Sequence, residues 1–364
     1  MAESLAPSKV IRGYFVTGFP GFVARHLARR LSEKGPVTLL AQEHFAEEAT
    51  KFAATLGTKA RVLVGDVVDM HLGLSSPEYR QICAEVTDIY HAAGITYLGT
   101  DKQTTWRVNV DGTKNMLELA ADVKQLARFN HFSTVYVSGD RVGVIMEDEL
   151  AAEQKFRNAF EGTKFEAEIL VRRAMARLPV TVYRPSIIVG DSRTGEIDRF
   201  EGPYLVAMLL VASPLAVPLP LPGNGAAPLN AVPIDFAVNA CVHIGHDPRG
   251  VGKTFHLVDP NPIAARRVYE LIAARIGKRL PKLSVSFKLA DALLKLPLVE
   301  PLARNQRVAF AYVNHLALYN SRNTHELLDG TGIACPPIEA YLDNLIAYAR
   351  ATYARVHGTE KKRA

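Results

Sequence analysis

Two different spacings of apolar residues alternate along the first half of the chain. Short runs of consecutive apolar residues, typical of buried strands, alternate with longer segments in which apolar residues recur at helical spacing. This alternation predicts an α/β fold with a doubly wound parallel sheet. The expected strands begin with residues 10–14 and continue with 37–41, 60–66, 86–94, 128–136 and 179–185, and the expected helices include 43–56, 109–126 and 155–177.

The pattern changes after residue 190, where proline and glycine become frequent. We therefore expect an α/β domain over residues 1–190 and a smaller, mainly helical substrate-binding region over 191–364, interwoven with the first. The most apolar run, residues 204–222, is broken by four prolines, which argues against a membrane-spanning helix. Later helices are expected at residues 263–276, 288–296, 304–316 and 338–353.

The composition is that of a globular protein with a sizeable core. The 364 residues are 48% hydrophobic and 22% charged, with a net charge of +6. No basic stripe is interleaved with aromatic residues, which argues against nucleic-acid binding. Cys83, Cys241 and Cys335 are far apart and lack metal-ligand spacing, so we expect no disulfide framework, no metal and a reducing, cytoplasmic compartment. The N-terminus lacks the apolar segment of a signal peptide.

A glycine turn joins the first expected strand to the helix that follows it. Gly18 permits the tight turn, Gly21 lets the backbone approach a pyrophosphate, and Ala24 still allows close packing of helix on strand. The helix N-terminus would then face the phosphates. The pattern predicts a dinucleotide site, and the plain alternative is a glycine turn that binds nothing.

Three later positions fit a dinucleotide but could equally have ordinary structural roles. Asp66 follows the third strand and could accept a hydrogen bond from an adenine amine, or simply end the strand. His91-Ala92-Ala93-Gly94 ends the fourth strand with small residues, against which a cofactor could lie. Asn109 opens the expected helix 109–126 and could be only its cap.

Three further residues could act on a carbonyl substrate. Thr134 and Tyr136 are expected on the same face of the strand 128–136, near its carboxyl end, where ligands bind in such sheets. Lys164 is expected early in the helix 155–177. Taken singly, a strand threonine is more often a packing residue, and a lysine among glutamates is more often solvated.

Together these elements resemble the extended short-chain dehydrogenase/reductase superfamily. The motifs in order are Thr-Gly-x-x-Gly-x-x-Ala at 17–24, Gly-Asp at 65–66, His-Ala-Ala-Gly at 91–94, Asn-Val-x-Gly-Thr at 109–113, the Ser-Thr strand and Lys164. The stretches 72–75, 183–196 and 232–236 resemble the fatty acyl-CoA and thioester reductase branch, of the "male sterility" type.

This resemblance implies hydride transfer between a nicotinamide cofactor and a carbonyl. In the family a Tyr exchanges the proton, a Lys one helical turn later lowers the pKa of that Tyr and holds the ribose, and a Ser or Thr polarises the carbonyl. Carried over, Thr134 and Lys164 match, but the Tyr position is Phe160. General acid–base steps contribute about 10²–10⁴-fold, so we expect impaired turnover with intact binding. The alternatives are a non-catalytic nucleotide-binding protein, or proton supply by Tyr136 or water.

The resemblance also implies which residues contact the cofactor. No Asp stands at the end of the second strand, where Gln42 stands instead, and Arg25 could approach a 2′-phosphate, although it could also be an ordinary surface residue. We therefore expect NADPH in preference to NAD. The expected cofactor contacts are Thr17, Gly18, Phe19, Pro20, Gly21, Phe22, Val23, Arg25, Gln42, Asp66, Val67, Ala92, Ala93, Gly94, Asn109, Lys164, Pro185, Ser186 and Ile187.

The expected substrate is an acyl thioester, carried on coenzyme A or an acyl-carrier protein, or the derived aldehyde. A hydroxysteroid-type dehydrogenase or a sugar-nucleotide epimerase is the alternative within the superfamily. The apolar run 204–222 and the amphipathic segment 285–298 could form an acyl channel or a lid resting on a membrane, or only core. The family's habit adds the expectation of a homodimer through the helix 155–177.

Overall fold

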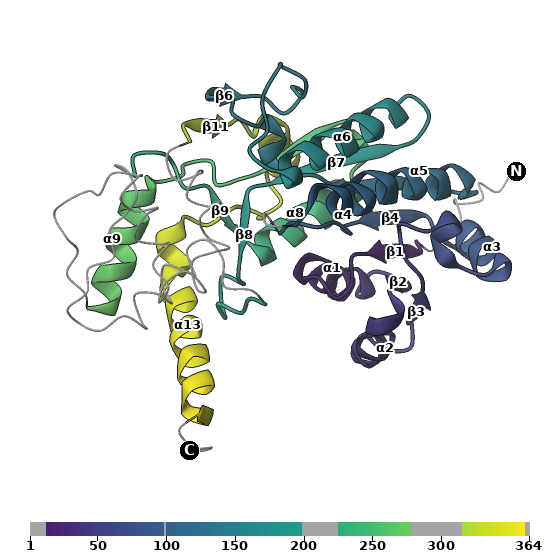
Figure 1. The fold of residues 1–364 in the computed structure, drawn as a ribbon, viewed down its shortest axis with the longest axis horizontal. Helices are drawn as coiled ribbons and strands as arrows, with labels where there is room; N and C mark the ends of the chain where they lie inside the picture. The colour runs from purple at the N-terminus through teal and green to yellow at the C-terminus, as the bar shows by residue number, and fades with distance from the viewer. Residues whose placement is uncertain (1–11, 98–99, 199–224, 278–314, 361–364) are drawn as a thin grey trace, which may run out of the picture.

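A seven-stranded, wholly parallel sheet forms the centre of the molecule in the computed structural model, which describes residues 12–97, 100–198, 225–277 and 315–360 (Figure 1). The strand order is β10-β7-β5-β4-β1-β2-β3. Most of these strands are buried throughout, as expected for a sheet covered on both faces. Their bounds are β1 Tyr14–Thr17, β2 Val37–Ala41, β3 Ala60–Val64, β4 Asp88–His91, β5 Arg128–Phe132, β7 Val180–Pro185 and β10 Thr254–Leu257. The prediction of a doubly wound parallel sheet is confirmed.

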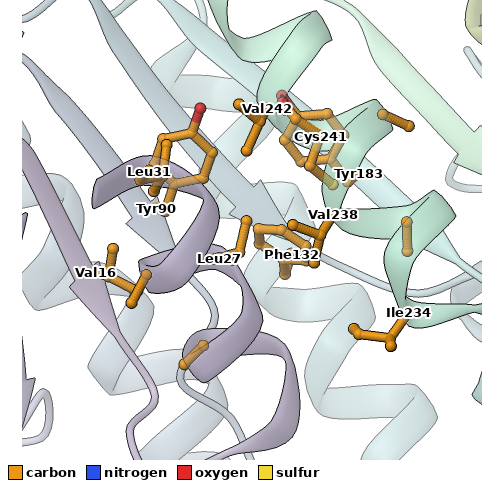
Figure 2. Packing of buried hydrophobic residues seen from close by; sticks show 14 of the residues in the cluster. Val16, Leu27, Leu31, Tyr90, Phe132, Tyr183, Ile234, Val238, Cys241 and Val242 are labelled. Carbon is orange, nitrogen blue, oxygen red and sulfur yellow. The ribbon is translucent and has the colours of Figure 1, made fainter. Parts of the chain in front are cut away.

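Helices cover both faces of this sheet. On one face, α1 (Phe22–Ser32), α2 (Ala46–Thr55) and α8 (Ile234–His246) contribute to a single apolar cluster. On the other face, α3 (Ser76–Glu85) and α5 (Gly112–Asp122) contribute to a second cluster, which Val171 of α6 (Ala159–Ala174) joins. The first cluster packs α1 directly against α8 above the central strands, as Leu27 of α1 and Val238 of α8 show (Figure 2).

The C-terminal half supplies parts of the sheet as well as a separate group of helices. β10 pairs with β7, and α8 packs against α1, so the sheet draws on residues either side of 190. A third apolar cluster joins α9 (Ala265–Ile276) and α13 (Ile338–Glu360). The division of the chain at residue 190 remains a prediction. Outside the main sheet lie two small parallel ribbons, β6 (Gly143–Ile145) with β11 (Ala317–Tyr319) and β8 (Ile187–Val189) with β9 (Ala231–Pro233), and the short helix α12 (Arg322–Leu328).

The fifth strand ends earlier than predicted. β5 stops at Phe132, and Thr134 begins a 3₁₀ turn, Val135–Ser138, because its side-chain oxygen accepts a hydrogen bond from Tyr136 N at 3.3 Å. Such a local side-chain bond competes with strand pairing. The expectation that Thr134 and Tyr136 share one face of a strand is therefore wrong.

Two predicted helices also begin elsewhere. The helix expected at 109–126 starts as α4 (Lys102–Trp106), capped by the side chain of Asp101, and continues through a π-helical turn, Arg107–Asp111, into α5. Asn109 consequently lies inside a helix and caps nothing. The helix expected from residue 155 begins at Ala159, because Asn158 caps it by accepting from Glu161 N at 3.0 Å.

Other predictions fall partly outside the described residues. α9 and α13 match the helices expected at 263–276 and 338–353. The run 204–222, the segment 285–298 and the helices expected at 288–296 and 304–316 lie outside the described part, apart from the last two residues of 304–316. None of the helices in the described part of the chain is long and apolar enough to cross a membrane.

Candidate dinucleotide and carbonyl site

The turn between β1 and α1 can accommodate only glycine at its first position. Gly18 has φ +100°, and a Cβ there would lie 2.7 Å from the carbonyl group of Ala92 and 2.8 Å from Ala93 N. Gly21 N donates to Gly18 O at 2.7 Å, and no side chain caps the start of α1 at Gly21. The first N–H groups of α1 are therefore suited to an anionic group such as a diphosphate.

His91 ties this turn to the neighbouring strand and helix. Its Nδ1 lies 2.9 Å from the Thr17 hydroxyl, which accepts from Ala93 N at 3.3 Å. Its Nε2 lies 3.1 Å from the Thr113 hydroxyl, which itself donates to Asn109 O at 2.7 Å, so the ring proton resides on Nε2. Burial and the charge of Lys164 lower the pKa of His91 to about 3. The His91 ring is therefore neutral at physiological pH. Ala92 and Ala93, which were predicted to contact the cofactor, lie against the Gly18 turn.

Gln42 and Asp66 meet at the carboxyl ends of β2 and β3. Gln42 Nε2 donates to Asp66 Oδ2 at 2.6 Å, and Val68 N donates to Asp66 Oδ1 at 3.1 Å. Val67 is buried and packs against Gly112, where a Cβ would lie 2.9 Å from its Cγ2. The sequence placed Gln42 and Asp66 near a cofactor separately, and the structure brings them into contact.

Gly94, Asn109 and Lys164 also come together. A Cβ on Gly94 would lie 3.1 Å from Asn109 Oδ1 and 3.4 Å from Lys164 Nζ. The Asn109 amide accepts from Ile95 N at 2.7 Å and donates to Ile95 O at 3.1 Å and to Thr163 Oγ1 at 3.0 Å. Asn109 therefore fixes the backbone that follows Gly94.

The candidate carbonyl-binding groups lie where α6 passes the end of β5. Lys164 Nζ donates to Phe132 O at 2.6 Å. Burial lowers the pKa of Lys164 to about 8, although the negative charge of Glu168 acts to raise it. Thr134 Oγ1 donates to Pro185 O at 3.4 Å. Phe160 is 7% exposed and lies one helical turn before Lys164. Thr134 and Lys164 are 30 residues apart in sequence, and both lie at the carboxyl end of β5.

A buried ion cluster that the sequence did not predict supports these groups. Glu168, one turn after Lys164, accepts from Ser133 Oγ at 2.5 Å and from Arg184 Nη2 at 2.6 Å. Arg172 Nε donates to Glu168 at 2.9 Å. Burial alone would raise the pKa of Glu168, but the two guanidinium groups hold it below its usual value. The sequence signal for it was the four-residue spacing of Lys164, Glu168 and Arg172.

The remaining predicted contacts surround the same edge of the sheet. Arg25 forms an ion pair with Asp198 at 3.6 Å. Ser186 N donates to Leu257 O at 3.1 Å, and Ile187 N donates to Asn230 O at 3.4 Å, so the segment after β7 is held between β10 and residues near β9. Phe19 is buried against Phe52. Within the described ranges no group of three or more His, Cys, Asp or Glu side chains could hold a metal ion. Pro20, Phe22 and Val23 complete the predicted turn and are only partly buried.

These residues fit a dinucleotide. The glycine turn leaves no room for a side chain where the backbone must approach a diphosphate, and the uncapped helix start offers N–H donors there. The turn, the Gln42–Asp66 pair and the Thr134–Lys164 region all lie at the carboxyl ends of parallel strands, where ligands bind in sheets of this type.

Sequence comparison identifies relatives with reductase functions. The chain is 26% identical over 276 residues to a fatty acyl-CoA reductase, wat, of Drosophila melanogaster, covering 63% of this chain and 53% of that protein. It is 26% identical over 216 residues to the glycine betaine reductase ATRR of Emericella nidulans, covering 58% of this chain and 17% of that protein. The chain thus spans about half of the first relative and a small part of the second.

Solved structures share the fold. The terminal R domain from the myxalamid PKS-NRPS biosynthetic pathway has a TM-score of 0.81 and 24% identity, covering 96% of this chain and 92% of that one. The reductase domain of a nonribosomal peptide synthetase from Mycobacterium tuberculosis has a TM-score of 0.72 and 18% identity, with 96% and 92% covered. The family model described as male sterility protein matches residues 16–241. The chain therefore belongs to the male sterility family, and it shares the fold of these reductase domains.

Proposed function

We propose that this chain is a cytoplasmic, NADPH-dependent reductase of acyl thioesters carried on coenzyme A or on a carrier protein. The observation that carries the proposal is the meeting of two groups at one edge of the sheet. The Gly18 turn packs on Ala92 and Ala93, and Lys164 contacts the end of β5 close to Thr134. A dinucleotide site beside a hydroxyl and an ammonium group would offer a hydride donor and hydrogen-bond donors to a substrate carbonyl.

Each residue has a distinct part in the proposal. NADPH, when bound, supplies a hydride to a carbonyl carbon. The start of α1 holds the diphosphate, and Asp66 accepts from the adenine amine. Lys164 holds the ribose, and Thr134 donates a hydrogen bond to the carbonyl oxygen. Residues 185–187 lie beside the nicotinamide.

The preference for NADPH rests on Gln42 and Arg25. Gln42 follows β2, where an acid would favour NAD by bonding the ribose hydroxyls. Arg25 and Asp198 are each 29% exposed, and a partly exposed ion pair contributes only about 0–1 kcal/mol. Arg25 can therefore leave Asp198 for a 2′-phosphate at little cost.

The thioester substrate is supported by the relatives and by the stretches 72–75, 183–196 and 232–236. The similar proteins include a fatty acyl-CoA reductase and peptide-synthetase reductase domains. A UDP-glucuronic acid 4-epimerase from Bacillus cereus shares the fold with a lower TM-score of 0.67, and the stretches 72–75 and 193–196 speak against that class. The homodimer, the membrane contact and the acyl channel remain predictions.

A non-catalytic nucleotide-binding protein is the second candidate. Phe160 favours it, because phenylalanine has no proton to donate. The two candidates differ in whether an acyl thioester accelerates NADPH oxidation.

The test is NADPH oxidation by the purified chain in the presence of a long-chain acyl-CoA. We expect thioester-dependent oxidation, and Gly18→Ala should abolish both NADPH binding and oxidation because its Cβ would clash with Ala92 and Ala93. Gly57→Ala is the matched control, since Gly57 has φ +91° and open space around its Cβ position. It carries the same backbone strain without the clash.

Unchanged oxidation in Gly18→Ala would disprove the assigned cofactor site. NADPH binding without any thioester-dependent oxidation, in this chain and in Phe160→Tyr, would favour the binding protein. Oxidation with NADH in place of NADPH would contradict the cofactor preference alone.

A further inference from the structure

We infer that Phe160 makes the aldehyde the final product of this site, so that the chain catalyses one two-electron reduction of a thioester and not two. The inference rests on the proposed function. It follows from what the site offers to the oxygen of the substrate carbonyl.

Contacts on either side of Phe160 fix its position. Arg157 Nη1 donates to Gly139 O at 2.7 Å, and Lys164 Nζ donates to Phe132 O at 2.6 Å. α6 therefore runs alongside the segment that follows β5 and packs on the 3₁₀ turn Val135–Ser138, and Phe160 lies between these two contacts along the chain. Phe160 is 7% exposed, so its ring occupies this place with little access to water.

The groups beside that turn differ in their ability to give up a proton. The Phe160 ring has none to give. The Thr134 hydroxyl is an aliphatic alcohol and donates a hydrogen bond without ionising. The Lys164 ammonium is fully buried and donates to Phe132 O. The site can thus stabilise an oxyanion by hydrogen bonding, but position 160 cannot protonate it.

Thioester reduction does not require that proton. Hydride adds to the carbonyl carbon, and the π-electron pair of the C=O bond moves to oxygen. The oxyanion then re-forms the C=O bond with that pair, the C–S bond breaks, and the thiolate leaves with the electron pair of the C–S bond and takes a proton from water. The products are an aldehyde, a thiol and the oxidised cofactor.

Reduction of the aldehyde, in contrast, does require a proton on the carbonyl oxygen. A second hydride adds to the aldehyde carbon and leaves an alkoxide with no leaving group, so the oxygen must gain a proton for the alcohol to form. Loss of a positioned general acid slows such a step by about 10²–10⁴-fold. The impairment expected from Phe160 therefore falls on the second reduction.

The experiment follows both reductions separately. The purified chain and Phe160→Tyr are each given NADPH with hexadecanoyl-CoA, and in a second reaction with hexadecanal alone. Products are identified by mass spectrometry, NADPH consumed per thiol released is counted, and the Kd of NADPH is measured by fluorescence. We expect one NADPH per thiol and accumulated aldehyde from this chain. Phe160→Tyr should consume two, release hexadecanol and reduce hexadecanal about 10²–10⁴-fold faster, with an unchanged Kd.

Two further variants isolate the proton donor. Phe165→Tyr makes the same chemical change on α6, at a partly exposed ring that packs on Phe156, and should still yield aldehyde. Tyr136→Phe tests the half-buried phenol of the 3₁₀ turn and should leave the aldehyde product unchanged.

The outcomes separate the inference from the proposed function. Hexadecanol as the main product of this chain would overturn the inference and leave the reductase intact, and its loss in Tyr136→Phe would identify Tyr136 as the donor. A chain inert towards the thioester beside an active Phe160→Tyr would also overturn it, because the first reduction would then need the phenol. Inactivity of both proteins with the thioester would remove the proposed function itself.

Discussion

Lys164 is a buried cation whose surroundings oppose its charge. Burial lowers its pKa from 10.5 to about 8, although Glu168 acts in the other direction. An unfolded chain would retain the proton on this lysine up to about pH 10.4. The folded protein therefore releases a proton from Lys164 at a lower pH than the unfolded protein does.

This difference predicts a pH-dependent contribution to stability. Between pH 8 and about 10.5 the unfolded chain binds more protons on Lys164, so the folded state gains relative stability as the pH rises. The free energy of unfolding of this chain minus that of Lys164→Met should rise by up to about 3 kcal/mol from pH 7 to 10.5. Urea denaturation at several pH values measures it. The subtraction removes the other titrating groups, and a flat or falling difference would contradict the buried, depressed lysine.

Individual residues were predictable to different degrees. Gly18 could be assigned to the turn from sequence because glycine alone adopts its φ of +100° without a steric cost. Gly21 has an ordinary φ of −54°, but a Cβ there would lie 2.7 Å from Gly18 O. Thr134 was predicted to lie near the carboxyl end of the fifth strand, but the 3₁₀ turn that it begins was not predicted. Its hydroxyl accepts a hydrogen bond from the backbone two residues later, and such a bond competes with strand pairing. The bonds of His91, Asn109 and Glu168 could not be foreseen, since their partners come from segments distant in sequence.

At the scale of elements, one face of α6 carries Phe160, Lys164 and Glu168 at four-residue spacing. Glu168 connects this face to Ser133 after β5 and to Arg184 of β7. The ion cluster therefore determines the rotation of α6 about its axis, and with it the positions of Lys164 and Phe160.

Removal of the carboxylate should destabilise the protein strongly. Glu168→Ala would leave Arg184, which is 1% exposed, as a buried charge that has lost its carboxylate partner. We expect a loss of about 3–5 kcal/mol in the free energy of unfolding, measured by urea denaturation. Glu48→Ala on the exposed face of α2 is the control and should change it by less than about 0.5 kcal/mol. Equal effects of the two variants would show that the cluster does not hold α6.

Most elements of the sheet were predictable because buried strands and amphipathic helices differ in period. Their ends were less predictable, since caps such as Asn158 and Asp101 begin helices at positions that the apolar pattern does not mark. α8 was not predicted. Of its 13 residues, 9 are buried, so it lacks the alternation of apolar and polar faces that reveals a surface helix.

At the scale of the whole molecule, the sheet is completed by the second half of the chain. β10 forms its edge beside β7, and α8 covers β1, β4, β5 and β7 together with α1 (Figure 2). The fold class was predictable because it follows from the alternation of elements along the chain. The contribution of residues 234–257 to the first domain was not predictable. It depends on the packing of α8 against α1 and of β10 against β7, which are distant in sequence.

A fragment that ends at residue 190 should therefore fail to fold. It would lack α8 and β10, exposing apolar residues such as Leu27, Phe132 and Tyr183 that are buried in the full chain. We expect no cooperative urea transition and no NADPH binding for residues 1–190, whereas the full chain should show both. A fragment that unfolds cooperatively and binds NADPH would establish 190 as a true domain boundary.

The strand order also has a consequence for synthesis on the ribosome. Strands β1 to β7 emerge within the first 185 residues, but β10, which pairs with the edge of β7 that β5 leaves open, ends only at Leu257. The nascent chain must therefore carry an open β7 edge and an uncovered apolar face while some 70 further residues are made, which takes about 4–14 s at typical elongation rates. During that interval the sheet is open to pairing with other chains, so expression should benefit from chaperones that shield exposed strand edges.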